Sequence, residues 1–125
     1  LLLLEGVPTL ELIVEADQEG FDLCVALSMV DQSKASVEQL STGVLRIQGD
    51  HANQPLLRKV ILQPLLAELK QGEHLRISIA GSAWPAIGIN PGNNHQQCGP
   101  PGAHCRVVTM RMNLSGSKLQ LSPLL

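Results

Sequence analysis

The residues best suited to chemistry lie in one short segment: His95, Cys98, His104 and Cys105. Two thiols and two imidazoles within eleven residues are the ligand types of a tetrahedral zinc site. Their spacing is not that of a standard zinc knuckle, and the adjacent His104 and Cys105 would be strained in binding one ion. Cys98 and Cys105 could instead form a disulfide, which would leave Cys24 unpaired. Unmodified polar loop residues are the third interpretation, and we assign no metal or cofactor.

Serine-hydrolase chemistry needs a nucleophile on a sharp turn of the form Gly-x-Ser-x-Gly, and the sequence has no such motif. The segment that begins at Gly81-Ser82 comes nearest but lacks the closing glycine. His51 and His74 each follow a glycine-containing turn, where a solvated or locally paired imidazole is expected. We therefore assign no catalytic residue to this chain.

Composition excludes several classes of partner. The chain has 125 residues, is 44% hydrophobic and 16% charged, and carries a net charge of −2 without a basic cluster. A folded core is expected, and a nucleic-acid partner is not. Apolar runs such as residues 1–4 are too short for a membrane span. Phe21 and Trp84 are the only aromatic residues, so surfaces that stack on sugars or bases are hard to build.

Alternating apolar and polar residues predict about seven strands and almost no helix. The expected strands are residues 10–15, 22–30, 42–48, 57–63, 74–80, 106–114 and 118–121. Pro64 before an apolar run, with Gly72 beyond it, predicts a short helical turn over residues 64–70. Within the strands, Arg46, Arg76 and Arg111 are expected to pair with acidic groups at a sheet surface or to face a partner domain.

Without long helices, parallel crossovers are excluded, and the pattern indicates an all-β antiparallel sandwich. We expect one domain over residues 1–125, and the start at Leu1 instead of methionine favours a fragment of a longer polypeptide. Residues 81–103 are rich in glycine, proline and asparagine and predict a long loop. Loops of this length are usually functional. Trp84, Pro85, Asn90 and Pro91 are our candidates for contact with another domain, and the alternative for Trp84 is a large ring that plugs one end of the aliphatic sandwich.

Six motifs, in order along nearly the whole chain, carry a family resemblance. They are DLCVALSMV at 22–30, LSTGVLR at 40–46, the proline at 64 with GEHLR at 72–76, SAWP at 82–85, NP at 90–91 and SKLQLSP at 117–123. This series resembles the C-terminal domain of X-Pro dipeptidyl-peptidases (S15 family) and of cocaine-esterase-like hydrolases (the CocE/NonD group).

The resemblance implies a jelly-roll β-sandwich of the galactose-binding-like type and a non-catalytic role. In such enzymes the Ser-Asp-His triad belongs to a separate α/β-hydrolase domain upstream, so no triad position falls in this chain. The resemblance implies that the domain packs on that upstream domain, shapes its active-site entrance and contributes to contacts in a homo-oligomer. The parent would be a serine hydrolase acting on Xaa-Pro peptides or acyl esters, with a cytoplasmic location favoured. The alternatives are a carbohydrate-binding module and a structural assembly domain.

Overall fold

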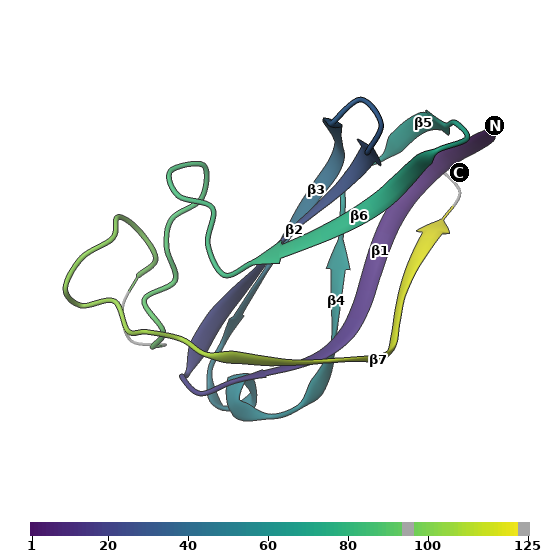
Figure 1. The fold of residues 1–125 in the computed structure, drawn as a ribbon. Helices are drawn as coiled ribbons and strands as arrows, with labels where there is room; N and C mark the ends of the chain where they lie inside the picture. The colour runs from purple at the N-terminus through teal and green to yellow at the C-terminus, as the bar shows by residue number, and fades with distance from the viewer. Residues whose placement is uncertain (94–96, 123–125) are drawn as a thin grey trace.

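The computed structural model describes residues 1–93 and 97–122 as an antiparallel β-sandwich (Figure 1). Its elements are β1 (Leu2–Ala16), β2 (Gly20–Asp31), β3 (Ser36–Gln48), the 3-10 helix η1 (Asp50–Asn53), β4 (Leu56–Ile61), β5 (Leu65–Leu69), β6 (Glu73–Ala80) and β7 (Met110–Ser122). The predicted all-β sandwich is confirmed. Among the described residues, no helix is long and apolar enough to cross a bilayer.

Each sheet is built around one long strand. In the first sheet, β1 pairs with β5 through residues 2–6, with β4 through residues 9–14 and with β7 through residues 7–16. In the second sheet, β2 is the central strand between β3 and β6. Every one of these pairings is antiparallel, as expected when short connections rather than helices join the strands.

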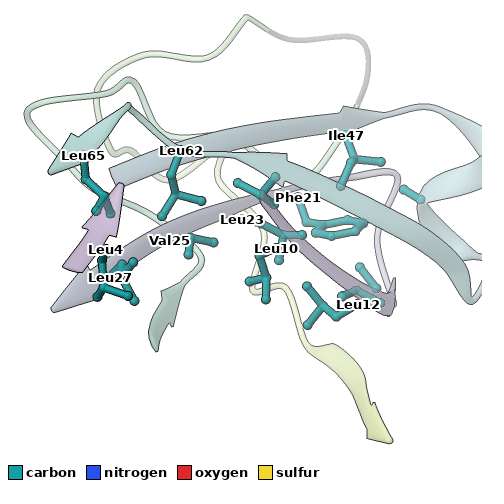
Figure 2. Packing of buried hydrophobic residues seen from close by; sticks show 14 residues of the cluster. Leu4, Leu10, Leu12, Phe21, Leu23, Val25, Leu27, Ile47, Leu62 and Leu65 are labelled. Carbon is teal, nitrogen blue, oxygen red and sulfur yellow. The ribbon is translucent and has the colours of Figure 1, made fainter. Parts of the chain in front are cut away.

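The core lies between the two sheets and is almost wholly aliphatic (Figure 2). Along β1, every second side chain from Leu10 to Ala16 is buried, which is the period-2 pattern of a strand with one covered face. Phe21 and Leu23 of β2 face these residues and are at most 2% exposed. The core also takes in one charged side chain, Arg58, whose guanidinium lies 5.5 Å from the centre of the Phe21 ring.

The strands of the two sheets approach closely where β3 lies beside the end of β4. A side chain at Gly43 would place its Cβ only 2.5 Å from the carbonyl oxygen of Ile61. Beside it, the Ser41 hydroxyl donates to the Gln63 carbonyl at 2.6 Å, and the Gln63 N–H donates to the Thr42 carbonyl at 3.0 Å. Glycine and a small hydroxyl residue therefore let the two sheets join along this edge.

The predicted helical turn over residues 64–70 is wrong, because Leu65–Leu69 forms strand β5. Burial alternates along this strand but its sequence does not, and leucine, alanine and glutamate favour a helix. Pairing with residues 2–6 of β1 decides in favour of the strand, and Leu65 is buried. The two strands expected over residues 106–114 and 118–121 are likewise one strand, β7, which bulges opposite β1 between Glu11 and Ile13.

Candidate functional site: the loop between β6 and β7

The chain between β6 and β7 leaves the sandwich and forms the long projection seen in Figure 1. This agrees with the prediction of a loop over residues 81–103, except that the irregular segment continues to residue 109. The projection is fixed to the second sheet at a cluster of polar side chains from three separate segments. Its members are Asp22 of β2, Arg46 of β3 and Asn90 of the loop, and we call this cluster the latch.

Asp22 is the centre of the latch and is 1% exposed. Its cross-strand neighbour Arg46 donates hydrogen bonds to both carboxylate oxygens, from Nε to Oδ1 at 3.1 Å and from Nη2 to Oδ2 at 2.9 Å. From the loop, Nδ2 of Asn90 donates to Oδ1 of Asp22 at 3.0 Å. Charge-assisted bonds of this bidentate kind are among the strongest hydrogen bonds in proteins. The hydrogen bond to Asp22 also raises the pKa of Arg46, so the guanidinium stays charged.

The latch also binds the backbone of the loop. Nη2 of Arg46 donates a second hydrogen bond to the carbonyl oxygen of Gly88. Oδ1 of Asn90 accepts the N–H of Gly92 at 3.1 Å, so one amide side chain joins the strand and the turn of its own segment. A side chain at Gly20 would place its Cβ 2.8 Å from Oδ1 of Asn90, so this close approach requires glycine.

Backbone hydrogen bonds complete the attachment of residues 88–92. Ile89 and Gly99 exchange two of them, at 2.7 and 3.1 Å. The carbonyl of Pro91 accepts from Arg106, and the carbonyl of Gly92 accepts from Glu19 in the turn between β1 and β2. This part of the loop is therefore bonded on both sides, although it has no regular secondary structure.

The four candidate contact residues fall into two groups. Trp84 is 45% exposed and Pro85 is exposed, and both lie at the part of the loop that precedes the latch. Asn90 is 7% exposed and Pro91 is fully buried. Asn90 and Pro91 are thus enclosed by the rest of this chain, whereas Trp84 and Pro85 present free surface.

A pocket of about 420 Å³ separates the early part of the loop from the outer face of the second sheet. Its floor includes Cys24 and Ala26 of β2, and its loop side includes Ala83, Ala86 and Ile87. Burial, and then the negative charge of Asp22, raise the pKa of the Cys24 thiol, so the thiol form is favoured at neutral pH. Cys24 is therefore a weak nucleophile in an uncharged, mostly apolar recess.

The structure brings together only part of the Cys and His cluster, and His95 lies outside the described residues. All three cysteines are free thiols. Cys98 accepts a hydrogen bond from Nε2 of Gln48 at 3.7 Å, while Cys105 lies 3.8 Å from Nε2 of its neighbour His104. Within residues 1–93 and 97–122, no group of three or more His, Cys, Asp and Glu side chains is placed to hold a metal ion.

His51, His74 and two of the three arginines lie where the sequence indicated. Arg76 is exposed on β6 and forms no salt bridge within the described part of the chain. His51 is exposed in η1, and His74 is exposed on β6. Arg111 pairs with Glu15 at 3.5 Å at the sheet surface, as Arg46 pairs with Asp22. The contact of Asn90 with Asp22 was not predictable from the sequence, because 68 residues separate them.

A comparison with known protein families finds a match that extends over both sheets and the loop. A family model, the X-Pro dipeptidyl-peptidase C-terminal non-catalytic domain, matches residues 2–119. No curated protein and no solved structure matches the chain. The family match covers almost the whole sandwich, from β1 into the last strand, together with the loop and its latch. This chain belongs to the family of X-Pro dipeptidyl-peptidase C-terminal non-catalytic domains.

Proposed function

We propose that the domain packs on an upstream α/β-hydrolase domain of the same polypeptide and shapes the entrance to its active site. The tip of the loop, residues 83–87, would supply part of the contact. Interdomain contacts of this kind bury about 600–1,500 Å². The parent enzyme would be a serine hydrolase that acts on Xaa-Pro peptides or acyl esters.

The observation that carries this proposal is the exposure of Trp84. It is the one tryptophan of a chain that is only 2% aromatic, and it is 45% exposed in the turn near the start of the loop. Aromatic side chains are enriched at the centres of interfaces, where they bury a large area with few rotatable bonds. A chain that uses its single indole outside the core is expected to use it for contact.

The shape of the loop also supports the proposal. The backbone of residues 88–92 is fixed by hydrogen bonds to three other segments, so the tip has a firm base. Loops held by a rigid scaffold are a common means of forming the mouth of an active site. The family is described as non-catalytic, which suits a part that positions or limits access instead of reacting.

The test is Trp84→Ala in the intact parent enzyme, assayed for hydrolysis of an Xaa-Pro substrate and for thermal unfolding. Loss of a central interface aromatic costs about 2 kcal/mol or more, so the interdomain contact should weaken and KM or stability should change. Leu114→Ala is the matched control, because Leu114 is 68% exposed in β7 and away from the loop. Equal behaviour of the two variants would contradict the proposed contact.

A further inference from the structure

We propose that Asp22, Arg46 and Asn90 are positioning residues whose latch sets where the Trp84–Pro85 tip stands. This inference rests on the proposed function, since it identifies what keeps the contact tip in place. The latch is not itself proposed to contact the upstream domain. It acts through the backbone of residues 88–92, to which it is bonded directly.

The segment that carries the tip is held by the second sheet at both of its ends. Before the tip, Ala80 at the end of β6 pairs with Cys24. After the tip, the carbonyl of Gly88 is held by Arg46, which is paired with Asp22. The end of β6 and the side chain of Arg46 on β3 therefore hold this segment from opposite sides of the central strand β2.

Inside the excursion the bonds are local. The Ile87 N–H donates to the Ala83 carbonyl at 3.1 Å, which closes a turn around Trp84 and Pro85. Across the pocket, Ala83 and Ile87 face the small side chains of the sheet. A local turn preserves the shape of the tip but does not orient it relative to the sheet. The orientation of the tip relative to the sheet therefore depends on the two ends of its segment. One end follows β6, and the other is residues 88–92, which the latch binds.

Burial makes the latch specific. Because Asp22 is 1% exposed, water cannot easily replace Arg46 or Asn90 as its partner. A buried carboxylate that loses a donor is left with a desolvated charge, so alternative placements of the loop are disfavoured. The latch should therefore hold residues 88–92 in one arrangement.

Trp84 provides a direct reading of the tip. The chain has no other tryptophan and no tyrosine, so fluorescence excited at the indole band reports on this one residue. With 45% of its surface exposed in the latched state, full exposure would about double the area open to a quencher. Acrylamide quenching and steady-state anisotropy of the folded chain then measure how firmly the tip is held.

The principal variant is Asn90→Ala, which removes the loop side chain from the latch but leaves Arg46 bonded to Asp22 and to the Gly88 carbonyl. We expect the quenching constant of Trp84 to rise about twofold and the anisotropy to fall, as local release of a loop requires. Arg46→Lys is the second variant, because it keeps a positive charge near Asp22 but cannot serve both the carboxylate and Gly88 in the same geometry. It should change the fluorescence in the same direction, even if Asn90→Ala fails to fold.

Leu12→Ala is the control for lost stability alone, because Leu12 is a core residue of β1 that is 1% exposed and belongs to the other sheet. It should lower the unfolding midpoint but leave Trp84 quenching unchanged in the folded state. Unchanged quenching in folded Asn90→Ala or Arg46→Lys would overturn the inference, as would an equal increase in Leu12→Ala. The fluorescence measurement needs no partner domain. If Trp84→Ala in the parent enzyme changed neither activity nor stability, that result would therefore overturn the proposed interdomain contact but not the role of the latch.

Discussion

Each sheet carries an ionic cluster on its outer face, and the two clusters differ in burial. On the second sheet, the latch surrounds Asp22, which is 1% exposed. On the first sheet, Glu11 lies between Lys59 and Lys118 at 3.6 and 3.8 Å, a row that we call the ladder. Both lysine side chains of the ladder are more than half exposed. Only the latch is enclosed by another segment of the chain, the loop after β6.

The difference teaches what each cluster can contribute. Glu11 is the direct cross-strand partner of Lys59 and of Lys118, so the ladder joins strands that backbone hydrogen bonds already join. The latch joins β2 and β3 to an irregular loop that has no strand pairing to the sheet. A solvent-exposed ion pair adds little stability to strands that are already paired. A buried ion pair can favour one arrangement of a loop over another, because breaking it leaves a buried charge without a partner.

The largest effect on stability should follow from Asp22→Ala. It leaves Arg46 and the amide of Asn90 without their acceptor, and loss of one partner of a buried pair costs about 3–5 kcal/mol. The Arg46 side chain is 34% exposed and can regain water, so we expect about 3 kcal/mol, at the lower end. Urea unfolding followed by circular dichroism measures this loss. A cost below about 1 kcal/mol would remove the contrast with the ladder.

A much smaller effect is expected from Glu11→Gln, which removes the charge at the centre of the ladder. Exposed pairs contribute about 0–1 kcal/mol, so unfolding in urea should shift only slightly. The difference between wild type and variant should vanish in about 1 M salt, where the screening length falls to about 3 Å. A loss as large as that of Asp22→Ala, or one that persists in salt, would show that burial is not what separates the two clusters.

The smallest effect is expected at Asp31, an exposed carboxylate at the end of β2 that accepts hydrogen bonds from a hydroxyl and two backbone N–H groups, with the charge of Lys34 as the least contribution. Its pKa is lowered chiefly by the hydrogen bond from the Ser33 hydroxyl, at 2.7 Å. A lowered pKa in the folded state means that the ionised form stabilises the fold above the unfolded pKa, and that this contribution is lost as pH falls through the folded value.

In Asp31→Asn, the free energy of unfolding should therefore fall slightly less steeply as the pH is lowered into the acid range. Above neutral pH the variant should be less stable than the wild type by a small, constant amount. Unfolding in urea at a series of pH values measures it. Unlike the effect at Glu11, this difference should survive high salt, because the principal partner is a hydroxyl group. Parallel acid profiles for wild type and variant would contradict the assigned cause.

Most strands were predictable from the sequence because their alternation is local. The side chains from Leu10 to Ala16 show the period of 2 directly, and the structure buries one face of that strand. The run from Leu65 to Leu69 was not predictable in the same way, since its residues suit a helix or a strand. Only the pairing with the first residues of β1 selects the strand, and that partner lies more than 60 residues away in the sequence.

The loop shows the same division at the candidate site. Its composition indicates an irregular segment, and its single indole is a candidate contact residue. Neither property shows that Asn90 points inward to Asp22 while Trp84 stays outside. Motif residues of one loop can thus have opposite roles, one holding the loop and the other presenting surface.

The sequence alone determined the fold class, the absence of a nucleophile elbow and the family, because these depend on residue types and on spacings along the chain. The tertiary structure decided which polar residues meet. Asp22, Arg46 and Asn90 come together only after β2 and β3 have paired and the loop has turned back on them. Burial then converts three ordinary polar residues into a latch, since a desolvated carboxylate must keep the donors that reach it.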